Sequence, residues 1–327
     1  MIYFLTESGI KTGLGHLYRA INLSQTLKKQ NKIKFILIQK SAKENDASIK
    51  ILKKNKITYH LFNKVNLLSF LKTKTKNTII FDLQKTELKY LDLAKKNFFK
   101  TIIVDDENNL NYYNADIIIN QNSYAKNLRY NFKNKNIIRL FGANYTILPK
   151  NNFFKFNNKL NNITKNIFLI FGGTDVKNFY QKISKKLSKF KLHINISNKI
   201  ISQKIKPLKI NNNIKFHNSN NLNKIIKKEK IDLIISCCGS GLYQMFLLNV
   251  PIVGLMCAKN QINAFNYYGN RGAIITSNLL TLNNTIRRIT LKKKTSSTKY
   301  AQKFVNIKGN FNINKIINRE INEYKKN

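Results

Sequence analysis

A short segment near the amino terminus places glycines beside a histidine and an arginine: Gly13-Leu14-Gly15-His16-Leu17-Tyr18-Arg19. It follows an apolar run at 2–5 and precedes apolar residues at helical spacing, so the sequence predicts a turn between a strand and a helix. Glycines in such a turn let backbone N–H groups approach a phosphate or a sugar. We interpret His16 as a candidate general base and Arg19 as a candidate phosphate or carboxylate ligand. A structural histidine and a solvated arginine are the alternatives.

A second glycine turn has the character of a phosphate site. Ser236-Cys237-Cys238-Gly239-Ser240-Gly241 follows a strongly apolar run and leads into a helical segment that contains Gln244. Backbone donors and the Ser240 hydroxyl suit a diphosphate, and Gln244 could reach a ribose hydroxyl. Asn260 and Gln261, which follow the next apolar run, are the amides we expect to hold sugar hydroxyls, although Asn260 could equally cap a helix.

Two acidic positions also follow predicted strands. Asp105 comes after the run at 101–104, and Asp175 follows the glycines of Phe171-Gly172-Gly173-Thr174. Each either caps a helix or points a polar group at a ligand. We include Asp105, Gly173 and Asp175 among the candidate substrate-binding residues, together with Gly15 in the first turn.

Composition limits the classes of function. The 327 residues are 43% hydrophobic, which indicates a globular chain, and their 59 Lys and Arg against 15 Asp and Glu give a net charge of +44. Such a charge is typical of proteins that bind nucleic acid or anionic membranes. The lysines are spread throughout among Asn and Ile and no nucleic-acid motif accompanies them, so we favour a coding bias and expect no nucleic-acid partner.

Cysteine and histidine positions predict no metal site and no cofactor. Cys237, Cys238 and Cys257 lack metal-ligand spacing, and no ligand set with the scattered His60, His193 and His217 suggests itself. The cysteines fit buried thiols in a reducing compartment. No stretch is apolar for long enough to span a membrane, so we expect a cytoplasmic protein, and a monomer.

Apolar runs alternate with helical patterns in two similar halves, which predicts two doubly wound α/β domains that face a cleft. We place the domains at 1–150 and 165–327, the second with the terminal helices, around a polar linker. The expected strands lie at 2–5, 35–38, 59–62, 78–81, 101–104 and 117–119 in the first half, and at 166–171, 192–196, 214–216, 231–236, 252–255 and 273–275 in the second.

Taken together, the motifs resemble those of a family of nucleotide-sugar hydrolases in the pseudaminic acid pathway, the UDP-2,4-diacetamido-2,4,6-trideoxy-β-L-altropyranose hydrolases, which are related to MurG-type N-acetylglucosaminyltransferases. The matching pieces occur in the family's order over residues 1–275. They are Gly13-Leu14-Gly15-His16 with Arg19, Val104-Asp105-Asp106, Asn120-Gln121-Asn122-Ser123-Tyr124, Gly142 with Tyr145, Phe171-Gly172-Gly173-Thr174-Asp175, Gly239-Ser240 and Asn260-Gln261.

The resemblance implies a GT-B fold whose second domain holds uridine diphosphate, with His16 as the base that activates water for attack on the anomeric carbon. It implies that Gly239 and Ser240 stabilise the departing diphosphate and that Asn260 and Gln261 orient the sugar. The family has Glu at the position of Gln244 and Tyr at that of Gln84. The first difference affects the contact with the ribose of the nucleotide, and the second affects the shape of the sugar pocket.

Two other functions are compatible with these residues. A glycosyltransferase of the same fold would use His16 to deprotonate an acceptor hydroxyl, and apolar, basic stretches at 62–71 and 98–100 could then face a membrane, unless they pack in the core. A basic protein that binds nucleic acid or membrane surfaces, without catalysis, is the alternative of another class.

Overall fold

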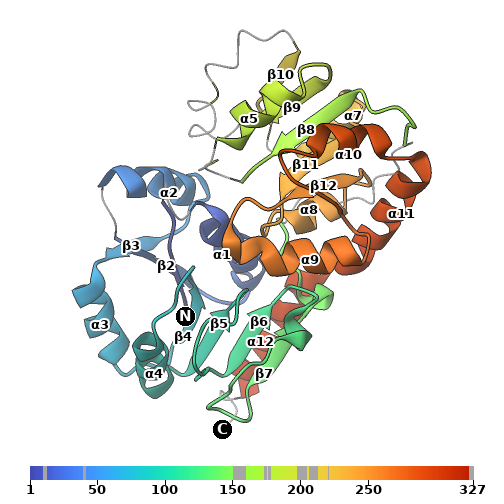
Figure 1. The fold of residues 1–327 in the computed structure, drawn as a ribbon. Coiled ribbons are helices and arrows are strands. Elements are labelled where there is room, and N and C mark those ends of the chain that lie inside the picture. The colour runs from blue at the N-terminus through green and yellow to red at the C-terminus, as the bar shows by residue number, and fades with distance from the viewer. Residues whose placement is uncertain are drawn as a thin grey trace. The chain divides into compact units, whose positions relative to one another are not determined.

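The computed structural model describes residues 1–9, 13–39, 42–149, 160–172, 175, 178–196, 205, 213–219 and 221–323. The chain forms two compact units, Met1–Lys150 with Asn306–Asn327, and Asn151–Val305. Each unit has a parallel sheet with helices (Figure 1), as the sequence predicts. Most of the predicted linker lies outside the described residues.

The first unit has a sheet of seven parallel strands in the order β3-β2-β1-β4-β5-β6-β7. The strands are β1 (Ile2–Thr6), β2 (Ile33–Ile38), β3 (Tyr59–Phe62), β4 (Thr78–Asp82), β5 (Lys100–Val104), β6 (Ile117–Asn120) and β7 (Ile138–Phe141). The helices are α1 (Gly15–Leu27), α2 (Ala42–Lys54), α3 (Lys64–Lys72), α4 (Leu88–Asn97) and α12 (Gly309–Glu323), with short 3-10 turns η1 (Ala125–Asn127) and η2 (Ala143–Tyr145). Sequence analysis did not predict the edge strand β7.

Successive residues of the central strands point to opposite faces, and each face packs on its own helices. Phe4 and Ile80 lie in a core cluster with Leu17 of α1 and Ile313 of α12. Leu5, Ile79 and Phe81 lie in another cluster with Leu67 and Leu71 of α3 and with Leu91 of α4. The sheet is therefore covered on both faces, which is the doubly wound arrangement.

The second unit has a sheet of six parallel strands in the order β10-β9-β8-β11-β12-β13. The strands are β8 (Asn166–Ile170), β9 (Lys191–Asn195), β10 (Ile214–His217), β11 (Leu233–Cys237), β12 (Ile252–Leu255) and β13 (Ile275–Ser277). Its helices and 3-10 turns are α5 (Phe179–Lys186), α7 (Leu222–Lys228), α8 (Leu242–Phe246), η4 (Lys259–Gln261), α9 (Ile262–Asn270), α10 (Leu282–Arg288), α11 (Leu291–Ala301) and η5 (Gln302–Phe304).

The prediction that all terminal helices belong to the second domain is wrong for α12, which is part of the first unit. Ile313 and Ile317 of α12 are fully buried in the cluster that contains α1. The Asn310 side chain accepts a hydrogen bond from Leu148 N at 2.9 Å and donates one to Leu148 O at 2.7 Å. Apolar burial and paired backbone groups together hold the helix there.

The apolar stretches that could have faced a membrane are largely core. Leu67, Leu71 and Phe98 are buried, and Phe62 and Phe70 pack against them. Phe70 makes edge contacts with the rings of Tyr3 and Phe62. Within the described residues, no helix is both long and apolar enough to cross a bilayer.

Candidate functional site

His16 and Asp82 meet where the strand order of the first sheet reverses. Strand β1 lies between β2 and β4, so the chain passes to one side of β1 and later to the other. His16 follows β1 at the start of α1, and Asp82 is the last residue of β4. In open parallel sheets this switch point, at the carboxyl ends of the strands, is the usual ligand site. The His16 Nδ1 and Asp82 Oδ1 atoms are 2.8 Å apart.

Arg19, three residues after His16 on the same helix, fixes the Asp82 carboxylate. Its Nε donates to Asp82 Oδ2 at 2.9 Å and its Nη2 donates to Asp82 Oδ1 at 2.6 Å, while Nη1 donates to Asp106. The Arg19 side chain is only 5% exposed. A buried fork with two carboxylates is a rigid arrangement, because both partners lose their freedom to rotate.

The charges of this cluster stabilise one another. Burial alone would lower the pKa of Arg19, but the carboxylates of Asp106 and Asp82 outweigh it and raise that pKa well above its usual range. Burial alone would raise the pKa of Asp82, but the Arg19 guanidinium, with help from His16, lowers it. Asp82 is therefore a carboxylate and an acceptor only.

This fixes the tautomer of a neutral His16. Its Nδ1 must carry the proton that it donates to Asp82, which leaves a lone pair on Nε2. The Arg19 Nη2 atom lies 3.2 Å from the same Nδ1, but two donors cannot bond to each other, so Asp82 Oδ1 accepts from both. The His16 side chain is 20% exposed and Asp82 only 2%. The arrangement is that of a histidine base oriented by a buried carboxylate.

A chain of amides extends the cluster to the end of β6. The Asn122 Nδ2 atom donates to Asp106 Oδ1 at 3.4 Å and to Asn120 Oδ1 at 2.8 Å. The Asn120 Nδ2 atom in turn donates to Tyr130 Oη at 2.8 Å. Tyr130 also lines a pocket, so one polar network connects the candidate base to that pocket.

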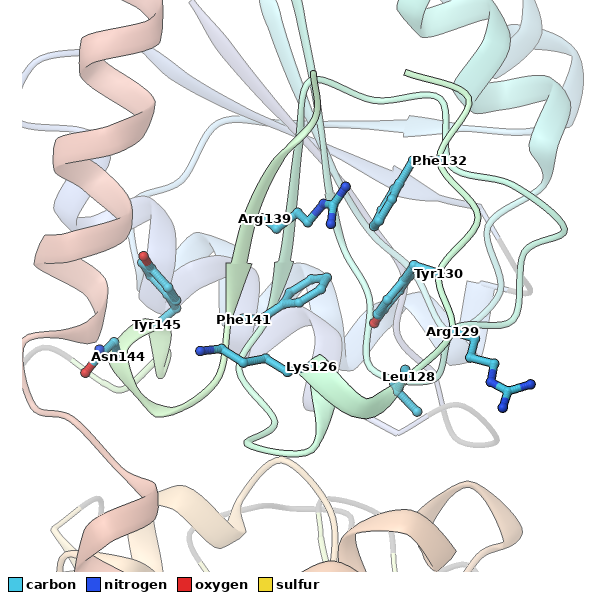
Figure 2. Close-up of a pocket in the computed structure, with 9 residues that line it drawn as sticks. All are labelled: Lys126, Leu128, Arg129, Tyr130, Phe132, Arg139, Phe141, Asn144 and Tyr145. Carbon is cyan, nitrogen blue, oxygen red and sulfur yellow. The ribbon is translucent and has the colours of Figure 1, made fainter. Parts of the chain in front are cut away.

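The pocket beside β7 is open, basic and aromatic, with a volume of about 670 Å³. Figure 2 shows the rings of Tyr130, Phe132 and Phe141 gathered near Arg139, whose guanidinium lies 4.4 Å from the Phe132 ring centre. The remaining lining residues are Lys126, Leu128, Arg129, Asn144 and Tyr145. Sequence analysis did not select these residues as a group, because they come together only around the unpredicted strand β7.

The predicted residues of the first unit divide into two groups. Gly15 is the first residue of α1 and is exposed, and the N-cap residue Leu14 before it makes no side-chain capping bond. Asp105, in contrast, uses its carboxylate locally, since it accepts from Tyr113 Oη at 2.9 Å and from Asn108 N at 3.0 Å. No helix begins among the described residues between β5 and β6, so Asp105 caps no helix but stabilises the loop after β5, while its neighbour Asp106 contacts Arg19.

In the second unit, two glycine turns also follow the strands on either side of a switch point, β8 and β11. Asp175 caps α5, because its carboxylate accepts from Phe179 N at 2.7 Å and Tyr180 N at 3.2 Å. Gly173 lies outside the described residues.

The other predicted residues of this unit gather after β11 and β12. Gln261 Oε1 accepts from Cys257 N at 3.0 Å, and its Nε2 lies 3.7 Å from the position a side chain at Gly239 would occupy. Ser240 and Asn260 are exposed, and Gln244 is half-buried in α8. The structure thus brings Gln261 to the glycine turn that precedes α8.

Sequence analysis missed Asp82 as a site residue, and it considered Asp106 only together with Asp105, which it selected instead. The one available signal for Asp82 was an Asp at the end of an apolar run, which is weak by itself. It also missed the meeting of His193 and His217, whose Nδ1 and Nε2 atoms lie 3.0 Å apart in the second unit.

Comparisons with known proteins support the fold. A scan against models of known protein families found no match. An uncharacterized protein of Methanocaldococcus jannaschii, MJ1062, is 26% identical over 283 residues, which are 82% of this chain but only 58% of the relative. The chain thus spans a little over half the length of that relative.

Several solved structures are similar along nearly the whole chain. MurG of Acinetobacter baumannii has a TM-score of 0.64 at 11% identity and covers 98% of this chain and 100% of its own. The Staphylococcus aureus MnaA–UDP complex has a TM-score of 0.60 at 10% identity, with coverage of 98% and 96%. With two parallel α/β units and these neighbours, the chain has a GT-B fold of two Rossmann-like domains.

Proposed function

We propose that this protein hydrolyses a UDP-linked diacetamido trideoxy sugar to UDP and the free sugar, a step of pseudaminic acid synthesis. The observation that carries the proposal is the buried Arg19–Asp82 pair that holds His16 with Nε2 available as a base. The resemblance of the motifs to the hydrolase family supplies the reaction and the sugar class. Solved neighbours bound to UDP and to UDP-GlcNAc support the nucleotide class.

In this mechanism, His16 Nε2 takes a proton from water as the water oxygen forms a bond to the anomeric carbon. The bond between that carbon and the diphosphate oxygen breaks, and UDP leaves with the electron pair. The cluster of one guanidinium and two carboxylates carries one net negative charge, which stabilises the imidazolium formed in this step. General-base catalysis of this kind contributes roughly 10² to 10⁴ in rate.

For UDP we propose the carboxyl ends of the second sheet. Backbone N–H groups around Gly239 and Ser240 would hold the diphosphate, and Gln244 would bond the ribose. Gln261 and Asn260 would orient the sugar. The proximity of Gln261 to Gly239 supports this grouping.

The test is UDP release from a panel of UDP-linked amino sugars, including the diacetamido trideoxy sugar, with no acceptor present. We expect release from that sugar by the wild type. Release that requires an added glycan or lipid acceptor would instead identify a glycosyltransferase. If UDP is never released and UDP does not stabilise the protein, both the hydrolase and the glycosyltransferase are refuted.

A further inference from the structure

Two histidines and a glutamate converge in the second unit, away from the residues assigned above. His193 on β9 and His217 on β10 come from neighbouring parallel strands, and Glu229 is the C-cap residue that follows α7. Their rings are nearly parallel, 20° apart, and Nδ1 of His193 lies 3.0 Å from Nε2 of His217. One nitrogen from each ring and a Glu229 oxygen all lie within 4.8 Å of one another.

One carboxylate oxygen of Glu229 has no hydrogen-bond donor among the described residues. Its Oε2 accepts a bond from Lys215 Nζ at 2.8 Å, which pins the carboxylate. The side chain is only 10% exposed, its Oε1 is buried, and none of the described residues donates a hydrogen bond to that atom. A buried carboxylate oxygen without a partner costs folding free energy, so its retention beside two imidazoles points to a cation.

His193 has one contact outside the cluster, of the kind that orients metal-binding histidines. The other nitrogen of His193, Nε2, lies 3.4 Å from Asn166 Oδ1. If Nε2–H donates to this amide oxygen, the lone pair of a neutral His193 is on Nδ1, the atom that faces His217. A second hydrogen bond of this kind commonly fixes the tautomer of a metal-bound histidine.

Burial and nearby charges act on both imidazoles. Burial, with the neighbouring His217, lowers the pKa of His193 to about 4, and burial lowers that of His217 as well. Lys191, Lys215 and Lys228 add positive charge that opposes a cation. The Glu229 carboxylate offsets part of that charge.

We propose that His193 Nδ1, His217 Nε2 and Glu229 Oε1 bind one zinc-like divalent transition-metal ion, with water as the fourth ligand. Ligand atoms about 2.1 Å from a tetrahedral ion lie about 3.4 Å apart, so the two nitrogens, now 3.0 Å apart, need to separate only slightly. Binding requires His217 to carry its proton on Nδ1. The ion would join β9, β10 and the end of α7, which is a structural role independent of the hydrolase proposal.

The experiment uses the full chain without a polyhistidine tag, stripped with a chelator and titrated with Co²⁺ and then Zn²⁺. We expect one equivalent of Co²⁺ with the visible absorption of a tetrahedral site, its displacement by Zn²⁺, and a rise in Tm with Zn²⁺. Glu229→Gln, which preserves shape, and His217→Ala should each weaken binding by at least about tenfold. His60→Ala, which alters a histidine of the first unit, is the matched control and should bind like the wild type.

Three results would overturn the proposal. The first is no stoichiometric binding by the folded wild type, which would mean that the two histidines form only an internal hydrogen bond. The second is binding that Glu229→Gln leaves unchanged, and the third is binding that His60→Ala abolishes.

Discussion

Asp82→Asn is the substitution that tests the proposed base most sharply. The carboxylate accepts three hydrogen bonds, from His16 Nδ1 and from Arg19 Nε and Nη2. An amide has one acceptor oxygen, so it cannot satisfy all three donors. If its oxygen faces Arg19 Nε, its NH₂ faces His16 and forces the ring proton onto Nε2, which removes the base.

The expected cost follows from these contacts. Turnover should fall by about 10² to 10⁴, the usual contribution of a general base. Stability should fall by about 3 kcal/mol, the lower part of the range for breaking a buried ion pair, because Asp106 still faces Arg19. UDP affinity should stay within about twofold, since the nucleotide site we propose lies in the other unit.

The assay measures UDP release under saturating substrate, together with urea unfolding and UDP titration of the same preparation. Asp106→Asn is the matched control, because it removes a carboxylate from Arg19 but leaves the His16–Asp82 bond intact. It should lower stability while reducing turnover much less than Asp82→Asn. Equal turnover losses in the two variants, or full turnover in Asp82→Asn, would refute the tautomer argument.

Three further changes test separate parts of the account. Gly309→Ala should destabilise the first unit by several kcal/mol, as overpacking does, because the added Cβ would collide with the Thr146 backbone; urea unfolding that matches the wild type would contradict this. Burial raises the pKa of Asp105, so just above pH 3.8 the folded state binds more protons than the unfolded state, and wild-type stability falls as pH rises there. The stability of Asp105→Asn relative to the wild type should therefore increase with pH in urea unfolding. A difference that stays constant with pH would contradict the raised pKa. Gln244→Glu should tighten UDP binding in calorimetry if the residue holds the ribose, whereas unchanged affinity would remove it from the site.

Much of the fold could be predicted because buried parallel strands are nearly continuous apolar runs. Thr78–Asp82 is buried at every position, and the sequence analysis predicted a strand at 78–81 from its apolar run. Strand β7 was missed because it lies at the sheet edge, where Arg139 interrupts the apolar pattern. The location of α12 depends on packing against α1, and local sequence carries no signal for a contact that distant.

The candidate site was predictable only in part, for the same reason. His16 and Arg19 stand in a glycine turn with a local signature. Asp82 lies 66 residues from His16 and meets it only because β1 pairs with β4 across the switch point. His193, His217 and Glu229 likewise converge through strand pairing and the end of a helix, so their spacing along the chain resembles no metal motif.

The most direct test of the hydrolase proposal follows the oxygen atom that water contributes. Wild-type protein and His16→Asn would be incubated with the UDP-linked diacetamido trideoxy sugar in water labelled with heavy oxygen, and both products analysed by mass spectrometry. We predict one labelled oxygen in the free sugar, none in UDP, and a turnover at least about 10² lower in His16→Asn with UDP affinity retained. Label in the UDP phosphate, or full turnover in His16→Asn, would contradict the proposal.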